Sequence, residues 1–515
     1  MIRLRNIQSI SRVLVATFLL GSLSACDWIQ LAFLNSIPFN SSPSLNPVLQ
    51  VYLGIDGLSP FAVEEAMKRG AFQKGAKGPL KLSQLITPFP GTSTYSWTRT
   101  LRSGKMDGYE IEYYSPEKDR LINSGLEGLL KHITPSIAEN ISFEKSYLTQ
   151  AFDYRATGYT HQASVYRETF SSFSNSLDEF FFLLDSRSKL SSIYFGYFAE
   201  LDVMGHMYSF EDIVRSLMNL SDRIDRFREL HPEREFHFTL FSDHGNDFLP
   251  IQDGRLVSYS DLMKEVGVQP VKTLSDHDPN TEVFALAVEH VRVTYLSVHT
   301  HPSLRETVAN RLSQIEATDL SVAKLLKAPE NAPTGLEWYG LWAEGKLAAT
   351  FGFSHETDQY VIPATIDWAR IGLTPHEGDE NGWVVISDEE AFGITAPSRY
   401  PDLFYRVRTG LSDTTAKHPA DVLISIKPGW AEVGFELPGG ANDIARQGFH
   451  GSLDVLGTMG TVLTEQAELG PYLRSDNLLD LFPDLKEHLK GRLKFPITEP
   501  DAHETLDYPQ AQSYL

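Results

Sequence analysis

The stretch from Phe236 to Asp247, which reads FHFTLFSDHGND, constrains the fold of this chain more than any other. Its first half is aromatic and β-branched and contains no Pro or Gly, which predicts a buried strand. Its second half places Asp243 and His244 side by side where that strand ends, with a Gly directly after them. Ligands of open α/β sheets bind at strand ends, and carboxylate and imidazole groups both bind metals. The stretch therefore predicts a strand with metal ligands at its tip.

Length and charge narrow the class of protein. A chain of 515 residues exceeds what one hydrophobic core normally fills, which predicts one large domain with an insertion, or two domains. The content of 42% hydrophobic and 22% charged residues is typical of a globular protein. The net charge of -22 argues against nucleic acid as a partner, because that affinity comes mostly from Lys and Arg on phosphates. The negative net charge does not exclude a small anionic substrate, since a bound metal can invert the local electric field.

Residues 1–26 have the composition of a secretory signal. Three arginines precede the apolar segment 13–21, which is too short to span a bilayer as a helix. The ending Leu-Ser-Ala-Cys resembles a bacterial lipobox, and Cys26 is the only Cys of the chain. We therefore expect an exported lipoprotein, anchored to a membrane through a lipid on Cys26 and facing the periplasm. The alternatives are an ordinary signal peptide, or an N-terminal helix with an incidental Cys.

The rest of the chain divides into four parts. Residues 27–47 contain an Asn-, Ser- and Pro-rich run that predicts a tether. From 48 to 249 strand patterns alternate with helix patterns, which is the signature of an α/β core with a mostly parallel sheet flanked by helices. Residues 250–440 are long for a connection within one sheet, so we interpret them as an inserted or cap subdomain. Residues 441–515 predict a return to the core, followed by a C-terminal tail.

Two further carboxylates follow predicted strands of the same sheet. Asp56 comes directly after the strand pattern of residues 48–55. Asp202 follows the strand pattern of residues 192–198, and His206 lies four residues later in what we expect to be a loop. Taken singly, an Asp at such a position is more often a helix cap or a turn residue. Three carboxylates at the ends of strands of one sheet are much harder to explain by chance.

Candidate nucleophiles stand before a predicted helix that begins near Trp97. Three hydroxyl side chains, from Thr92 to Thr94, follow a Pro-rich turn there. Hydroxyl groups at a helix start are usually caps, and the local pattern favours that interpretation. The same position also exposes a hydroxyl to free N–H groups, which suits a phosphoryl group. Near the end of the chain, His450 lies between an aromatic residue and a Gly, where a His is most often structural.

Additional elements follow from the periodicity of the sequence. We expect a long amphipathic helix over residues 211–230. Further helices are expected over residues 126–132, 177–184, 305–326 and 478–490, and strands over 360–362, 383–387 and 422–426. The aromatic segment from Tyr109 to Tyr114 is a candidate pocket lining, although aromatic pairs more often serve packing alone.

The motifs together resemble those of the alkaline phosphatase superfamily, and within it the type I phosphodiesterase/nucleotide pyrophosphatase branch. They occur in the same order: Ile55-Asp56-Gly57, a Pro-rich turn with Thr and Ser before a helix, Leu201-Asp202-Val203-Met204-Gly205-His206, Ser242-Asp243-His244-Gly245 and His450-Gly451. The likeness covers residues 47–250 and 445–465. It implies an alkaline-phosphatase-like sheet with an inserted cap subdomain.

The resemblance also implies two divalent metal ions, usually zinc, that share one phosphoryl group. Two sets of protein ligands carry over: Asp56, Asp243 and His244 with the nucleophile hydroxyl for one ion, and Asp202, His206 and His450 for the other. Imidazole and carboxylate are ligand types that suit zinc. One ion would turn the hydroxyl into an alkoxide, and the other would stabilise the leaving oxygen of an in-line displacement.

The chain departs from the family at the nucleophile. Members have Thr or Ser, one further residue, and then commonly Pro. Ser93 fits this register with Tyr95 in place of Pro, and the following Ser96 and Trp97 also match. Counting back from Ser103-Gly104 selects Thr94 instead, and Thr92 is a third choice. We prefer Ser93.

These features predict metal-dependent hydrolysis of phosphodiesters or phosphomonoesters through a phosphorylated Ser or Thr. A lipoprotein that keeps the fold but acts as a non-catalytic binding or assembly factor is the alternative from another class. A related transferase or sulfatase activity is a second alternative. A sulfatase needs a Cys or Ser in a Cys/Ser-x-Pro-x-Arg context, and the Ser93 segment has neither the Pro nor the Arg. A cytoplasmic phosphoglycerate mutase does not fit an exported chain.

Overall fold

The computed structural model describes most of the chain downstream of residue 47. The described ranges are 48–122, 151–155, 169–187, 191–250, 255–290, 293–364, 378–379, 381–432, 448–466, 469–490 and 492. The expected signal segment 1–26 with Cys26, the expected tether 27–47 and the expected helix 126–132 lie outside these residues. Among the residues described, no helix has both the length and the apolar composition needed to cross a membrane.

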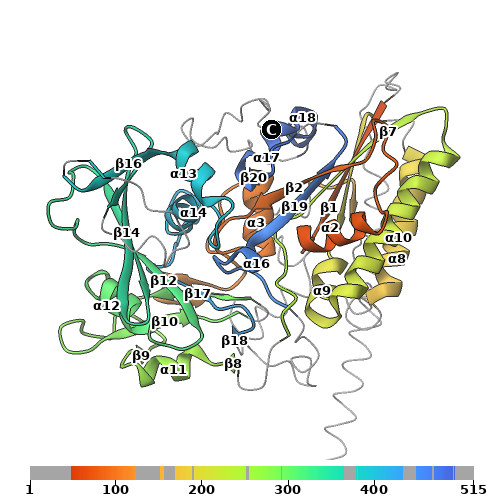
Figure 1. Cartoon of the computed structure of the whole chain (residues 1–515). Helices are drawn as coiled ribbons and strands as arrows, with labels where there is room; N and C mark the ends of the chain where they lie inside the picture. Colours follow the sequence, from red (N-terminus) through yellow and green to blue (C-terminus); the bar gives the residue numbers. More distant parts are fainter. Residues whose placement is uncertain are drawn as a thin grey trace, which may run out of the picture.

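A seven-stranded sheet forms the core that carries the motifs (Figure 1). Its strands, in spatial order, are β20 (Tyr472–Arg474), β2 (Lys81–Ile86), β19 (Met459–Thr464), β7 (Glu235–Phe241), β1 (Val48–Ile55), β6 (Ile193–Phe198) and β5 (Tyr154–Arg155). All neighbouring strands pair in parallel except β19, which runs antiparallel to both β2 and β7. Because β1, β6 and β7 run in parallel, their carboxyl ends meet at one edge of the sheet.

Helices cover both faces of this sheet, which confirms the predicted α/β class. Alternate residues of β1, such as Leu49 and Val51, pack against one helix layer. Tyr52 points to the opposite face and packs with the other layer. The first layer contains α2 (Pro60–Lys68), α8 (Thr169–Arg187) and α10 (Phe210–Leu230), and the second contains α3 (Ser93–Thr100), α17 (Leu478–Leu481) and α18 (Pro483–Lys490).

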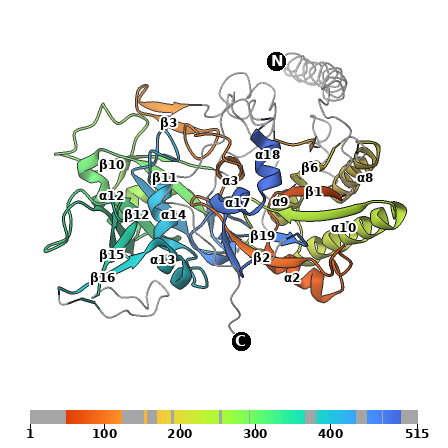
Figure 2. The ribbon, with the colours of Figure 1, turned by 90° about the horizontal axis from the view of Figure 1, so that it is seen from above.

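A second sheet of nine strands lies beside the core, on the side away from α8 and α10 (Figures 1 and 2). Its spatial order is β16 (Trp383–Ser387), β15 (Gln359–Pro363), β14 (Lys346–Ser354), β13 (Glu337–Ala343), β12 (Thr318–Lys324), β17 (Val422–Ile426), β11 (Tyr295–His299), β10 (Phe284–Val288) and β9 (Gln269–Pro270). All pairs are antiparallel except β9 with β10. These strands fall within the predicted insertion 250–440, whose boundaries stay a prediction.

The remaining elements are shorter. They are β3 (Tyr113–Ser115), β4 (Arg120–Ile122), α9 (Glu200–Met207), β8 (Leu256–Val257), α11 (Tyr259–Glu265), η2 (Pro302–Leu304), α12 (Arg305–Leu312), α13 (Asp388–Thr395), α14 (Leu403–Gly410), β18 (Ala431–Glu432), α16 (Val455–Thr458) and η3 (Ser475–Asn477). A capping box formed by Ser209 and Asp212 starts α10, and its long apolar stripe packs on the core sheet.

Three element predictions are wrong in detail. The expected helix 305–326 is the helix α12 followed by the strand β12, whose apolar residues also suit a buried strand. The expected helix 478–490 is divided into α17 and α18, because Pro483 cannot continue a helix. The segment expected as a loop after β6 forms the short helix α9, which contains both Asp202 and His206.

Candidate metal centre and nucleophile

The strand tips and two neighbouring segments bring the predicted residues together. Asp56 follows β1 and Asp243 follows β7, while α9 begins directly after β6. Gly57 has a φ of +67°, and a Cβ there would lie 2.8 Å from Cα of Asp202. The turn after β1 therefore packs closely against α9, an approach that only Gly allows. The Gly57 amide also donates a hydrogen bond of 3.2 Å to Oδ1 of Asp243.

The structure distinguishes between the three candidate hydroxyls. Ser93, the first residue of α3, places its Oγ 3.1 Å from Oδ1 of Asp56 and 3.0 Å from Nε2 of His244. Thr94 turns its hydroxyl to Glu110, at 3.4 Å. Thr92 stands at the N-cap position of α3 but donates to the Tyr109 carbonyl, at 2.9 Å, and makes no capping bond. Only Ser93 therefore joins the carboxylate and imidazole groups of the strand tips.

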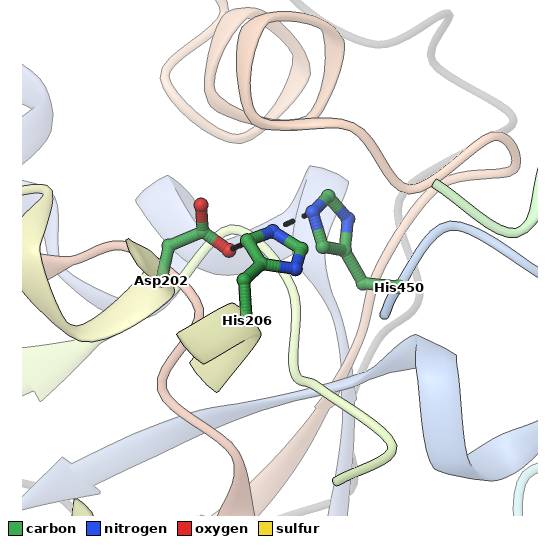
Figure 3. Close-up of side chains that lie close together, drawn as sticks. All are labelled: Asp202, His206 and His450. Carbon is green, nitrogen blue, oxygen red and sulfur yellow. Dashed lines mark ion pairs between the residues drawn. The ribbon is translucent and has the colours of Figure 1, made fainter. Parts of the chain in front are cut away.

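The second ligand set also converges (Figure 3). His206 lies one helical turn after Asp202 on α9, so both side chains share one face of the helix. Oδ1 of Asp202 is 3.3 Å from Nε2 of His206 and 3.6 Å from Nε2 of His450. The loop that carries His450 is held in place by Asp247, whose backbone amide and side chain both bond to the backbone of Phe449, at 2.9 Å each.

Each of the three imidazoles presents Nε2 to the cluster. Nδ1 of His206, His244 and His450 lies 2.7, 2.9 and 2.8 Å from the carbonyl oxygens of Gly448, Gly245 and Gly91. Because a carbonyl oxygen only accepts, Nδ1 must carry the proton in each ring. Hydrogen bonds from Nδ1 to a backbone carbonyl fix the orientation of the ring and leave Nε2 as the ligand atom, as in metal sites.

The donor atoms fit divalent cations. Ligand atoms of Asp202, His206 and His450 lie within 4.8 Å of one another, and so do those of Asp56, Asp202 and His244. Asp202 belongs to both groups. Among the described residues, Oδ1 of Asp202 and Oδ2 of Asp243 are buried and have no hydrogen-bond partner. Buried carboxylate oxygens without a donor are costly unless they bind a cation. These residues would hold the metal ions that the family resemblance implies.

Proton affinities in this cluster are strongly shifted. Burial and the neighbouring Asp56 raise the pKa of Asp243 well above its usual range. Burial lowers the pKa of His244, but Asp243 and Asp56 raise it by more than this, so that the pKa is raised to about 10. Burial and His244 lower the pKa of His450, whose ring stacks on His244 at 3.6 Å between centroids. The carboxylates thus hold positive charge at His244, a position where a cation would compete with the proton.

Tyr197 also contacts the site, although no sequence motif predicted a role for it. Its phenolic hydroxyl donates a 2.5 Å hydrogen bond to Oδ2 of Asp56. Tyr197 is the penultimate residue of β6, so its place near a strand tip was the available signal. Aromatic residues are common in buried strands, which is why this signal is weak.

Comparison with known families connects this geometry to a class of enzymes. Residues 94–341 match the profile of the family described as type I phosphodiesterase / nucleotide pyrophosphatase. Over these residues the chain resembles this family. The resemblance inferred from the motifs is therefore confirmed. The matched range of the phosphodiesterase family contains Asp202, His206, Asp243 and His244, whereas Asp56, Ser93 and His450 lie outside it.

Solved structures of ectonucleotide pyrophosphatase/phosphodiesterase 5 from mouse and human are similar to this chain. Both share 10% sequence identity with it, and each comparison covers 85% of this chain and 95% of the other. The TM-scores are 0.41 for the murine and 0.42 for the human protein. A third structure is an inactive variant of the murine protein in complex with AMP, with a TM-score of 0.41. Comparison with curated proteins returned no match.

Proposed function

We propose that the chain hydrolyses phosphate esters through attack of Ser93 on the phosphoryl group, at a site that holds two divalent cations, zinc in both positions. The observation that carries this proposal is the position of Ser93 Oγ, which lies 3.0 Å from His244 Nε2 and 3.1 Å from Asp56 Oδ1. The match of residues 94–341 to the phosphodiesterase family model supports the enzyme class, phosphoric ester hydrolase.

The residues of the site have separate roles in this proposal. Asp56, Asp243 and His244 would hold one cation, and Asp202, His206 and His450 the other. When bound, the cations lower the pKa of the attacking hydroxyl and neutralise charge on the phosphoryl oxygens. Asp56 and His244 fix the position of Ser93 Oγ, which removes the entropic cost of aligning it. Ser93 is the first residue of α3, and the free N–H groups at a helix start favour negative charge beside it.

The reaction has two steps. Ser93 Oγ forms a bond to phosphorus as the bond between phosphorus and the leaving ester oxygen breaks, and the proton of Ser93 passes through the solvent to the leaving oxygen. Water then attacks the phosphoserine and releases phosphate or a phosphomonoester, which restores the hydroxyl. The buried position of Asp243 and His244 keeps bulk water from the charged groups during both steps.

Activity of the purified, zinc-loaded protein tests the proposal. We expect turnover of bis-p-nitrophenyl phosphate, p-nitrophenyl phosphate or both. Ser93→Ala should lower kcat by about 10³-fold or more, with zinc content unchanged. Thr94→Val serves as the comparison, and a larger loss in Thr94→Val than in Ser93→Ala would move the nucleophile to Thr94. Loss of zinc but not of activity in Asp243→Ala would defeat the mechanism. Near-zero zinc after careful purification would favour a binding protein.

Two further parts of the proposal concern the surroundings of the site. We infer that residues 250–440 select the substrate, because the nine-stranded sheet they contain meets the site through the bridge between Val293 and His450. We also infer that Cys26 carries a lipid which anchors the protein on the periplasmic side of a membrane. This second inference is supported by the motif before Cys26. Cys26→Ser should move the protein from the membrane fraction to the soluble fraction; unchanged fractionation would contradict the anchor.

A further inference from the structure

A buried arginine binds the segment that joins His450 to β19. Arg406 lies on α14 and is 1% exposed. Its guanidinium donates four hydrogen bonds, three of them to this segment. The acceptors are the carbonyl oxygens of Leu453 at 2.9 Å, Ser452 at 2.9 Å and Pro401 at 3.2 Å, and the hydroxyl oxygen of Thr458 at 2.8 Å. The side chain of α14 therefore reaches the backbone that follows the third imidazole of the site.

The backbone of this segment takes hydrogen-bond donors from the guanidinium. Ser452 and Leu453 are buried, so their carbonyl oxygens need donors from the protein. The Thr458 hydroxyl donates to the Ser452 carbonyl at 2.8 Å, and Arg406 donates to both carbonyls. A guanidinium suits this task because it presents five N–H groups in a fixed, planar fork. The position of the segment is therefore tied to that of α14.

The helix α14 also supports the second backbone segment that holds the His450 ring. Nδ1 of His450 donates to the Gly91 carbonyl oxygen, at 2.8 Å. Two residues before Gly91, the carbonyl oxygen of Phe89 meets α14, where a Cβ on Gly410 would lie 2.3 Å from it. The guanidinium of Arg406 lies 5.9 Å from the centroid of the Phe89 ring. Both segments that place the imidazole therefore pack on one helix.

The other buried arginine of α14 has a different environment. The guanidinium of Arg408 lies 4.0 Å from the centroid of the Phe353 ring, on β14 of the nine-stranded sheet. Residues two apart on an α-helix point about 200° apart, so one arginine faces the second sheet while Arg406 faces the segment after His450. Arg408 is therefore a matched comparison for Arg406.

We propose that Arg406 is a positioning residue for the cation site of Asp202, His206 and His450, and that it acts by holding Nε2 of His450 in place. The inference rests on the proposed function, which assigns a cation to these three residues. Asp202 and His206 share one face of α9, so the helix sets their relative position. His450 comes from a segment distant in sequence, and its separation of 3.6 Å from Oδ1 of Asp202 depends on what holds that segment.

Titration of the full-length, metal-free protein with Co²⁺ tests this role in Arg406→Met. The visible absorption of Co²⁺ reports the ligands around each ion, and circular dichroism reports the fold. We expect the wild-type protein to bind two ions. Arg406→Met should keep the ion at Asp56, Asp243 and His244 but bind the other about 10–100-fold more weakly, the usual effect of losing a group that orients a ligand. Wild-type affinity for both ions in this variant would overturn the inference.

Two further variants separate positioning from stability. Arg408→Met makes the same change on the same helix and should keep both ions with wild-type affinity, whatever its melting temperature. Equal loss of one ion in Arg408→Met would mean that any damage to α14 weakens the site, which overturns the inference. Arg406→Lys keeps the charge but cannot reach all four oxygens, so it should bind the second ion about tenfold more weakly.

Arg406→Lys decides the question if Arg406→Met does not fold. Wild-type affinity for both ions in a folded Arg406→Lys would then overturn the inference. Failure of both variants to fold would make Arg406 a residue that the fold itself requires, which overturns the inference as well.

Turnover of bis-p-nitrophenyl phosphate by the zinc-loaded protein separates this inference from the proposed function. If the wild-type protein binds two ions but hydrolyses no ester, the function fails, and a weaker second ion in Arg406→Met still supports the inference. If the ester is hydrolysed and Arg406→Met binds both ions as the wild-type protein does, the inference is overturned and the function stands. A wild-type protein that binds fewer than two ions overturns both.

Discussion

Buried carboxylates occur in two regions of this molecule, and their partners differ. At the strand tips, Asp243 is buried beside a second carboxylate, Asp56, and burial and this neighbour raise its pKa. Near the junction of the two sheets, Asp476 is buried beside Arg99 on α3. Burial raises the pKa of Asp476, but Arg99 lowers it below its usual range. Asp476 is therefore ionised, and Arg99 compensates its charge. Among the described residues, no Arg or Lys compensates the charge of Asp243 in the same way.

The structural network extends beyond Asp476. Arg474 on β20 is 2% exposed and binds Asp388 and Asp402 at 2.6 Å each, and its guanidinium stacks 3.6 Å above the ring of Tyr405. The hydroxyl of Tyr405 in turn donates to Asp476 at 2.6 Å. This network links the edge of the core sheet to α13 and α14. The comparison teaches that burial of acidic groups marks a functional site only where no Arg or Lys compensates them.

The largest expected effect on stability follows from removal of Arg474, the cation at the centre of this network. Arg474→Met removes the guanidinium that pairs with the two buried carboxylates Asp388 and Asp402, and should lower the free energy of unfolding by about 3–5 kcal/mol. Urea unfolding followed by tryptophan fluorescence measures it. Arg69→Met, at an exposed ion pair, is the matched control and should leave the urea midpoint unchanged. A shift in Arg474→Met no larger than the control's would contradict the structural role of this network.

Removal of metal comes next in size. Zinc at a free concentration of 100 times its Kd should stabilise the wild-type protein by about 2.7 kcal/mol, because only the folded chain assembles both ligand sets. Thermal unfolding with zinc and with a chelator measures the difference. Arg69→Met should keep the zinc response, and Asp243→Asn should lose most of it. Equal melting temperatures for the wild-type protein under both conditions would argue against a metal site.

Replacement of a buried Asp by Asn should change the stability of the metal-free protein in opposite directions in the two regions. Because burial and Asp56 raise the pKa of Asp243, ionisation of this group destabilises the folded state at any pH above its usual pKa of about 4. Asp243→Asn should therefore stabilise the metal-free protein by about 1–2 kcal/mol at pH 8 and have no such effect below pH 4. Asp476→Asn should destabilise it at pH 8. Urea unfolding of the metal-free variants at both pH values measures these changes. A lower free energy of unfolding for Asp243→Asn than for the wild-type protein at pH 8 would contradict the comparison.

The smallest effect concerns two matched tyrosines, each of which donates to a buried carboxylate. Tyr197→Phe removes the hydrogen bond to Asp56 and should weaken zinc binding about tenfold, since it no longer orients a ligand. Tyr405→Phe removes the equivalent bond to Asp476 and should leave zinc affinity unchanged. Competition with a zinc chelator measures both. Equal losses in the two variants would mean that the effect on zinc is indirect.

Much of the fold could be predicted because buried strands of this chain are apolar runs with sharp ends. The expected strands 48–55, 383–387 and 422–426 agree with β1, β16 and β17 residue for residue. The division between α12 and β12 could not be predicted, since no Gly or Pro separates them and the apolar residues of the strand also fit a helical period. The division at Pro483 could have been predicted from the Pro itself.

The residue types of the site could be predicted from the sequence, but their arrangement in space could not. Each of Asp56, Asp202 and Asp243 follows a strand, and this position is visible in the sequence. The choice between Ser93 and Thr94 depends on Glu110, which approaches from a later segment and occupies the Thr94 hydroxyl. The four-residue spacing of Asp202 and His206 was the signal for α9, although the N-cap residue of this helix makes no capping bond that local sequence would suggest.

The position of β19 has a consequence for the order in which the protein is made. This strand lies between β2 and β7, and it is synthesised more than 200 residues after β7. Until β19 is added, β2 and β7 each keep an unpaired edge, which is a hazard for aggregation. His450 precedes β19 by a few residues. The chain therefore joins β2 to β7 and gains the last imidazole of the proposed metal site in the same late interval, so zinc capture would report that β19 has entered the sheet.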